Sequence, residues 1–287
     1  MDIMGKRKTW YTISIAVILI GFVFLLFNGL NFGIDFTGGT ILEFTFENKV
    51  TNTEIRDTLS QLDFSIDPQL QQSDLEGKPG VIIKTEELNT DQISSVESVL
   101  ENKYSSTDMI RSDMVGPLIG KELRRNAIFA IIIASLAIVA YISMRFEFRF
   151  AIVAIITLLH DVSIVLGLFA IMQKEINTAF VAALLTIIGY SINDTIVIFD
   201  RIRENMKLMR RTPFVEKANT AVLDTLPRSI NTSLTTLITI LAIYFFGGAS
   251  LKIFMLALFI GMFAGTYSSI FVASPLLVTW TQKITKK

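Results

Sequence analysis

The stretch FVAALLTIIGYSINDTIVIFDRIREN, residues 180–205, decides how the rest of the chain is interpreted. It is an apolar run long enough to cross a bilayer, yet it carries a carboxylate, Asp194, inside it. An ionised Asp near the middle of a lone transmembrane helix costs about 2.5 to 3.5 kcal/mol, so such a group normally faces partner helices or water and is functional. We therefore interpret the stretch as a spanning helix with Asp194 as its first candidate site residue. The alternative is a buried acid with a structural role alone.

The other polar residues of this helix follow steps of three and four residues, so they share one face. They are Thr186, Tyr190, Asn193, Asp200 and Glu204. The opposite side is Ile, Leu, Val and Phe, which predicts a polar stripe that faces a protein interior. Asp200 and its neighbour Arg201 lie at the charged end, where membrane-interface residues are more usual than relays.

Composition places the whole chain among membrane proteins. Of 287 residues, 51% are hydrophobic and 18% are charged, and the mean hydropathy is +0.54. Lys plus Arg and Asp plus Glu both number 26, and this balance argues against a nucleic-acid partner. The chain has no cysteine, so any domain outside the cell must fold on its core alone. We expect no metal and no cofactor.

Six apolar stretches have the length of membrane spans. They cover residues 10–28, 126–144, 151–172, 178–199, 229–246 and 253–280. The basic segment GKRK precedes the first stretch, which we interpret as a retained anchor rather than a signal peptide. Lys and Arg are concentrated in MRFEFR, RIRENMKLMRR and the final QKITKK, which places both termini in the cytoplasm.

Between the first two spans lies a segment of lower hydropathy, residues 31–117, that we expect to fold outside the membrane. Its pattern is strand, helix, strand, strand, helix, strand, with strands at 40–46, 67–73, 81–85 and 109–115 and a turn at EGKPG, residues 76–80. Thr51 followed by Glu54 predicts a capping box on the first helix, residues 51–62, and the second helix covers 89–104. This order predicts a ferredoxin-like domain.

The expected fold class is thus a six-helix membrane protein with one α+β ferredoxin-like extracytoplasmic domain. The expected divisions are 1–30 for the N-terminus and first helix, 31–117 for the outside domain, and 118–287 for the remaining helices. Within the last part, residues 201–226 are predicted to form a basic, amphipathic cytoplasmic loop along the membrane surface.

Further charged residues fall inside or beside the spans: His160 and Asp161 in the third, and Arg228 at the start of the fifth. At 1.5 Å rise per residue, Asp161 and Asp194 lie about one helical turn apart in depth and could share a cavity. Arg228 is expected to pair with Asp194, or else to extend to the headgroups. Neighbouring residues point about 100° apart, so we expect His160 and Asp161 to face different ways and one of them to be merely buried.

Small and hydroxyl side chains recur in the last two spans. Arg228 begins a stripe that continues through Asn231, Thr232, Thr235, Thr236 and Thr239. Such a stripe either lines a pathway or serves packing and backbone hydrogen bonding. Gly261 and Gly265, spaced as GxxxG, predict close helix packing.

The paired aspartates also allow an enzymatic interpretation. Asp161 and Asp194 on adjacent spans could form the dyad of an intramembrane aspartyl protease, in which two carboxylates share a proton. Their contexts, LLHDVS and SINDTI, lack the glycine-aspartate signature of that class. We expect a protein that is not an enzyme.

Several segments resemble a known family. FGIDFTGGT (residues 32–40), LLHD in the third span, GYSINDTIVIFDRIREN (189–205) and LPRSINTSLTT (226–236) are similar to signature segments of the SecF members of the SecD/SecF family of bacterial protein export. The resemblance covers nearly the whole chain. Its first motif supplies Gly33, Asp35, Phe36, Thr37, Gly38 and Gly39 as family residues.

This resemblance implies one six-helix half of an ion-driven transporter of the resistance, nodulation and division (RND) superfamily, in a bacterial plasma membrane. A SecD-like subunit would supply the other half, and the pair would associate with the SecYEG channel. Proton or sodium flow would then assist late translocation of unfolded preproteins. The family's ion-coupling residues correspond to Asp194 and Arg228. The alternatives are a scaffold that conducts no ions and, third, half of a small-molecule exporter.

Overall fold

The computed structural model describes residues 1–75, 77–104 and 106–285. The chain divides into two compact units, a helical unit of residues 1–31 and 129–287 and a sheet unit of residues 32–128. The sheet unit therefore includes the start of a helix that continues into the helical unit.

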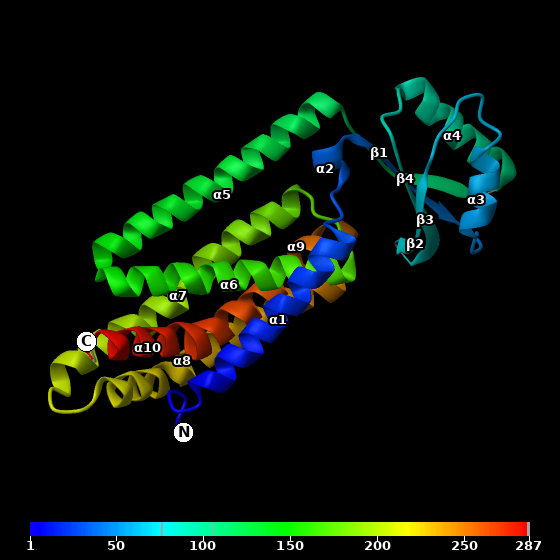
Figure 1. Cartoon of the computed structure of the whole chain (residues 1–287). Helices are drawn as coiled ribbons and strands as arrows, with labels where there is room; N and C mark the ends of the chain where they lie inside the picture. The colour runs from blue at the N-terminus through cyan, green and yellow to red at the C-terminus, as the bar shows by residue number, and fades with distance from the viewer. Residues whose placement is uncertain (76, 105, 286–287) are drawn as a thin grey trace. The chain divides into compact units, whose positions relative to one another are not determined.

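The sheet unit has the order strand, helix, strand, strand, helix, strand, preceded by a short helix (Figure 1). Its elements are α2 (Ile34–Thr37), β1 (Gly39–Phe46), α3 (Asn52–Leu59), β2 (Gln69–Leu75), β3 (Lys78–Thr85), α4 (Thr90–Lys103) and β4 (Thr107–Val115). The sheet is antiparallel with the strand order β2-β3-β1-β4. The predicted ferredoxin-like fold is confirmed.

Local sequence explains where the two helices of this unit begin. The hydroxyl of Thr51 accepts from the backbone N–H of Glu54, whose carboxylate accepts in return from the backbone N–H of Thr51, so the predicted capping box is present. Asn89 and Gln92 form a second box before α4. Both helices pack on one face of the sheet, and the core between them contains Leu42, Phe44, Phe46, Val81, Ile83, Ile55, Leu59, Val96 and Leu100.

The predicted turn at residues 76–80 is too long, because Lys78, Pro79 and Gly80 already belong to β3. Pro79 is aligned with Asp74 of β2, but the alignment of β3 with β1 starts only at Gly80. Proline lacks the N–H that a central strand needs, and it is tolerated here because this end of β3 has a neighbour on one side only.

The helical unit confirms the predicted six spans, since six helices of the described residues are long and apolar enough to cross a membrane. Their elements are α1 (Arg7–Asn28), α5 (Pro117–Arg145), α6 (Phe148–Met172), α7 (Thr178–Leu208), α8 (Phe214–Phe246), and a last span made of α9 (Ala249–Ser268), η1 (Ser269–Ala273) and α10 (Ser274–Thr285). The helices run past the apolar stretches, because the charged flanking residues also favour helix.

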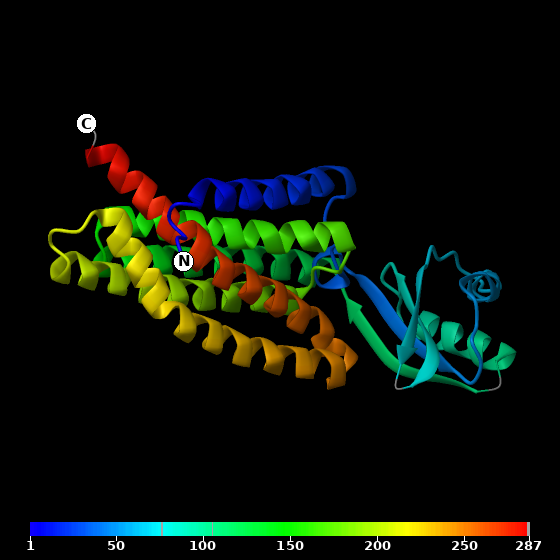
Figure 2. The ribbon, with the colours of Figure 1, turned by 90° about the horizontal axis from the view of Figure 1, so that it is seen from below.

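The long helices lie side by side with α7 near the centre of the unit (Figure 2). α7 packs against α8 and α9, and α6 packs against α1 and α9. Gly21 of α1 meets Gly167 of α6 so closely that a Cβ on Gly21 would lie 2.9 Å from the Gly167 Cα. α5 enters the core mainly near its C-terminal end, through Ile142, and Phe146, the residue after the helix, adds to the same core.

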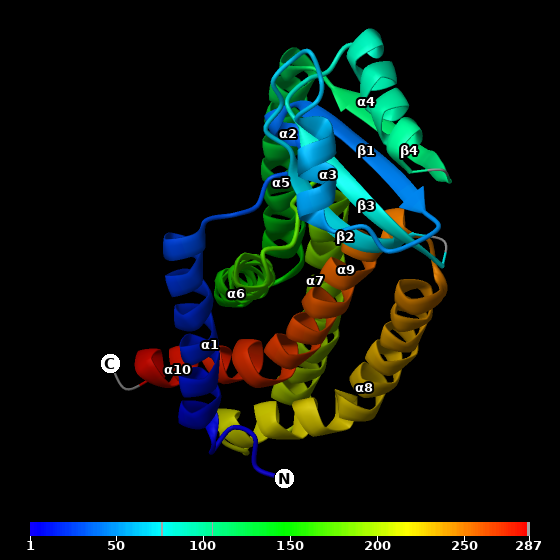
Figure 3. The same ribbon diagram turned by 90° about the vertical axis from the view of Figure 1, so that its right-hand side faces the viewer.

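The loop predicted at residues 201–226 is mostly helical, which corrects the sequence interpretation. α7 continues to Leu208 and α8 already begins at Phe214, so only a short connection separates them. α8 then runs through Pro227 and is visibly bent in Figure 3, as expected where a proline removes a helix hydrogen bond. Its amphipathic first part buries Ala218, Ala221 and Val222 in the bundle core, so this face packs on protein.

The last span is interrupted by one π-helical turn, η1, that the sequence analysis did not anticipate. Pro275 follows it at the start of α10. A proline ring clashes with the carbonyl four residues earlier, and a wider turn before it relieves that clash. The turn brings Ser268 and Ser269 to the inside of the bundle, where both are buried.

Candidate functional site

α7 positions the site, and α9 holds it tightly on one side. On the tight side, a Cβ on Gly261 would lie 2.3 Å from the Ile187 side chain, and a Cβ on Gly265 would lie 2.9 Å from the Cβ of Ser191. The predicted close packing by the GxxxG pair is therefore confirmed, with α7 as the partner helix. The polar residues of α7 are consequently fixed in height and rotation.

The first buried centre surrounds Asp161, which is 0% exposed. Its Oδ2 accepts hydrogen bonds from the hydroxyls of Ser191 on α7, at 2.5 Å, and Ser268 on α9, at 2.8 Å. Its Oδ1 lies 2.9 Å from Nδ1 of His160. One carboxylate thus joins three helices, and hydroxyl and imidazole groups satisfy both of its oxygens.

The expectation that His160 and Asp161 face different ways is wrong. Their Cβ atoms do diverge around α6, but the imidazole is long enough to turn back and reach the neighbouring carboxylate. Both side chains are buried. Hydroxyl groups extend this polar region along α7, where Thr195 lies 2.8 Å from Ser269 of η1.

The second buried centre surrounds Asp194, which is 5% exposed and faces α8. The Arg228 guanidinium interacts electrostatically with its carboxyl. The Ser229 hydroxyl lies next to the carboxyl but does not form a regular hydrogen bond with it. Among the described residues, three buried oxygens here have no hydrogen-bond partner: Oδ2 of Asp194 and the hydroxyls of Tyr190 and Ser229. Buried polar atoms are normally paired, so this group is suited to a proton, a water molecule or a small cation.

The two carboxylates occupy separate centres, although they lie at nearby depths as expected. Asp161 is bonded to Ser191, which precedes Asp194 by one turn of α7. The hydrogen-bond partners of Asp161 described above come from α6, α7 and α9, whereas Arg228 and Ser229, which lie next to Asp194, come from α8. They are connected through α7 and do not share one cluster.

A polar face of α7 and α8 lies beside Asp194 and is interrupted by the exposed apolar residues Leu234 and Ile238. Asn193 and Thr186 of α7 are exposed on it, as are the following residues of α8: Arg228, Asn231, Thr232, Thr235 and Thr239. The hydroxyls of Thr235, Thr236 and Thr239 donate to carbonyls one turn earlier in α8. The hydroxyls of those three threonines therefore find their hydrogen-bond partners within α8. This favours a role in helix packing over a role in lining an ion pathway.

The charged end of α7 is built from ion pairs. Asp200 lies 3.5 Å from Arg145 and 3.7 Å from Arg203, and Arg201 lies 2.7 Å from both Glu204 and Asp224. These side chains are partly exposed, as befits residues at a membrane interface. Asp200 therefore belongs to the end of the bundle and does not join the buried centre of Asp194.

The family motif near the first span lies in the sheet unit and shapes its entry. Gly38 and Gly39 have φ of +77° and +131°, and a Cβ on Gly39 would lie 2.5 Å from the carbonyl oxygen of Thr85. The hydroxyl of Thr37 donates to the Gly33 carbonyl and closes α2, in which Phe36 and Asp35 lie. The two glycines thus allow the chain to turn from α2 into β1.

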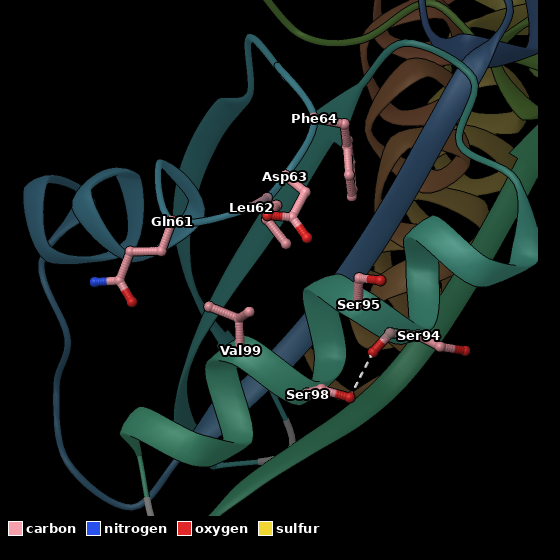
Figure 4. A pocket seen from close by; sticks show the side chains of 8 residues that line it. All are labelled: Gln61, Leu62, Asp63, Phe64, Ser94, Ser95, Ser98 and Val99. Atoms are coloured by element: carbon pink, nitrogen blue, oxygen red, sulfur yellow. Dashed lines mark hydrogen bonds between the residues drawn. The ribbon is translucent and has the colours of Figure 1, made fainter.

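The sheet unit also has an open depression between the segment after α3 and helix α4 (Figure 4). Apolar atoms come from Leu62, Phe64 and Val99. Polar atoms come from Gln61, Asp63 and the serines of α4, Ser94, Ser95 and Ser98. The lining is mixed, with no charge cluster that would select one ligand.

Sequence reasoning missed Ser191, Ser229, Ser268, Ser269 and Tyr267 as site residues. A signal was present for Ser268 and Ser269, because two adjacent serines interrupt an otherwise apolar span before a proline. Among the described residues, no group of three or more His, Cys, Asp or Glu side chains could hold a metal ion.

Comparison with known proteins supplies the family context. The family "Protein export membrane protein SecD/SecF, C-terminal" matches residues 95–283, and "SecD/SecF GG Motif" matches residues 23–50, which include the two glycines before β1. The chain is similar to "Protein translocase subunit SecF" of Thermobaculum terrenum, with 42% identity over 99% of this chain and 95% of the relative.

Longer relatives are similar as well. "Protein translocase subunit SecDF" of Thermus thermophilus is 40% identical over 98% of this chain, which spans only 39% of that relative. The crystal structure of SecDF from Thermus thermophilus, described as a translocon-associated membrane protein, superposes with a TM-score of 0.90 and 37% identity. The match again covers 98% of this chain and 39% of the crystallised one.

Proposed function

The chain belongs to the SecD/SecF family of protein export membrane proteins, and on this premise we propose that it couples ion flow to protein translocation as an accessory subunit of the Sec translocase. The observation that carries the proposal is the carboxyl of Asp194, buried inside a spanning helix with one oxygen unpartnered and Arg228 acting on it. A buried ionisable group of this kind is typical of ion pathways in transporters.

A SecD-like subunit is the partner that we propose for the exposed polar face of α7 and α8. In the SecDF relative one chain holds a part that matches this protein and a further part that does not. Asn193 and Asn231 on a spanning surface are costly in lipid and need polar partners or water. Transporters built of two related halves place their ion sites at the junction of the halves, and Asp194 borders this face.

The proposed coupling step is uptake and release of a proton at Asp194, with sodium as the other candidate ion. Water that reaches the unpartnered Oδ2 would deliver the proton, and movement of Arg228 toward or away from the carboxyl would change its affinity. One proton that crosses 100 mV supplies about 2.3 kcal/mol. That free energy is comparable to one population shift between two conformations and no more. Several cycles are therefore needed for each preprotein.

The sheet unit is the part that we propose to lie outside a bacterial plasma membrane and to contact unfolded preprotein. The lining of its depression, with Leu62, Phe64 and Val99 among polar side chains, suits weak contact with many sequences. Lys and Arg at the ends of α5, α7 and α10 favour a cytoplasmic position for that end of the bundle, next to the SecYEG channel and the lipid headgroups. We expect no catalytic activity.

Site-directed cross-linking tests the partner assignment, because the chain has no natural cysteine. Asn193→Cys and Thr235→Cys should each form a cross-link with a coexpressed SecD-like chain. Leu19→Cys is the matched control, since Leu19 is exposed on α1 and the C-terminal half of α8 lies on the other side of the helical unit from α1 (Figure 3). Equal cross-linking of all three variants, or copurification of a small-molecule substrate without any SecD-like chain, would contradict the proposal.

A further inference from the structure

His160 presents a second buried titratable group that the coupling step at Asp194 does not use. Its side chain is 6% exposed, and its Nδ1 lies 2.9 Å from Oδ1 of Asp161. Its other ring nitrogen, Nε2, is buried and has no hydrogen-bond partner among the described residues. An imidazole nitrogen that is buried and unpaired is unusual and indicates a position for a ligand.

The groups around His160 define its charge environment. From its own helix it faces Asp161, and from α9 it faces Tyr267, whose ring is stacked at 6.2 Å. α7 contributes the Ser191 hydroxyl to Asp161, and α1 contributes Ser14, which donates to the Tyr267 hydroxyl. Within the described part of the chain no Lys or Arg is buried, so the imidazole is the one cation available to this carboxylate.

The hydrogen bond to Asp161 determines which ring nitrogen carries the proton. A carboxylate accepts only, so a neutral His160 must present Nδ1–H to it and leave the lone pair of Nε2 free. The hydroxyls of Ser191 and Ser268 hold Asp161 in place while it does so. Asp161 is therefore a positioning residue for the imidazole.

We propose that Nε2 of His160 is a second proton-binding site of the helical unit, positioned by Asp161 and separate from Asp194. A hydronium ion supplies the proton: one of its O–H bonds breaks as the N–H bond at Nε2 forms, which leaves a water molecule and an imidazolium. Without the proton, the site carries the negative charge of Asp161, which accepts hydrogen bonds from two serines and the imidazole. With the proton, the site is an ion pair without net charge. Both states suit a membrane interior better than an isolated charge would.

The test is nitrogen NMR of the protein labelled with ¹⁵N-histidine in lipid nanodiscs, where a single His gives one pair of ring signals. At high pH we expect protonated Nδ1 and unprotonated Nε2, and on acidification the Nε2 signal should convert to the protonated form. A protonated Nε2 in the neutral ring, or no change at Nε2 between about pH 5 and pH 9, would overturn the proposal.

Variants separate the positioning role from general packing. Asp161→Asn replaces the acceptor by an amide that can also donate, so the fixed Nδ1–H tautomer should be lost and the neutral ring should show a mixture of the two tautomers. Asp194→Asn is the matched control and should keep the tautomer of the wild type, since Asp194 lies in another centre. Equal tautomer populations in both variants would contradict the assignment. The wild-type spectrum suffices if Asp161→Asn fails to fold, and none of these spectra depends on protein export.

Discussion

Replacement of Gly265 by alanine perturbs the point where α9 holds the site helix. The added Cβ would lie 2.9 Å from the Cβ of Ser191 and 3.3 Å from its Cα, and the backbone of α7 cannot yield as the tip of a flexible side chain would. α9 must therefore move outward, and the 2.8 Å hydrogen bond from Ser268 of α9 to Asp161 is lengthened. Overpacking of this kind costs about 1 to 3 kcal/mol, and the weakened bond to a buried carboxylate adds to that loss.

We expect Gly265→Ala to lower the free energy of unfolding by about 1 to 3 kcal/mol, measured by reversible denaturation in bicelles. Gly189→Ala is the control on α7, because a Cβ there meets nothing within 4 Å. Alanine favours helix over glycine by up to about 1 kcal/mol, so this variant should be unchanged or more stable. A Gly265→Ala protein as stable as Gly189→Ala would refute the close packing of α7 and α9.

Three further predictions concern the sheet unit and the charged end of the bundle. Gly39→Ala should destabilise the sheet unit by about 2 kcal/mol or more in thermal unfolding, because φ of Gly39 is +131° and the added Cβ meets a carbonyl oxygen. Gly77→Ala is the control: φ of Gly77 is +80° and its Cβ meets nothing within 4 Å, so this variant should lose only about half as much stability. Hydrogen bonds from the backbone N–H and the hydroxyl of Thr51 lower the pKa of Glu54. The stabilisation by the Glu54 carboxylate is therefore present above about pH 4.3 and is lost as the pH falls through the pKa of Glu54 in the folded protein. Glu54→Gln should therefore lose less stability than wild type between about pH 5 and pH 3, and equal acid sensitivity in a pH series of melting curves would count against the capping box. Arg201→Ala removes partly exposed ion pairs, so the melting temperature and export should stay close to those of the wild type; a severe export defect would move the functional site toward this end.

The elements with strong periodic patterns could be predicted from sequence, and the errors fell where tertiary contacts decide. Apolar length gave the six spans, and alternation with a capping box at Thr51 gave the ferredoxin-like order. The amphipathic segment after α7 was misjudged as a membrane-surface loop. Its apolar face fits a membrane surface and a protein core equally well, and only packing of Ala218 and Val222 on the bundle distinguishes the two.

The candidate site was predictable where a charge inside an apolar run marks it. Asp194, Asp161 and His160 are all buried in the structure, and the Arg228 guanidinium interacts electrostatically with Asp194. The hydroxyl partners were not predictable, because serine is common in membrane helices and the rotation of α9 depends on the π-turn before Pro275. Helical angle alone also misled for His160, since side-chain length and torsions decide which neighbours meet.

The proposed coupling requires that Asp194 take up and release an ion during each cycle, and gradient-driven export by an Asp194 variant measures this requirement. Asp194→Asn keeps the size of the side chain and removes the titratable group. In membrane vesicles that contain the SecD-like partner, the variant should assemble as wild type does and export a preprotein at the rate seen without a gradient. Wild type should be accelerated by the imposed gradient in the same assay. Full gradient-stimulated export by Asp194→Asn would contradict the coupling role and leave a scaffold that conducts no ions as the better account.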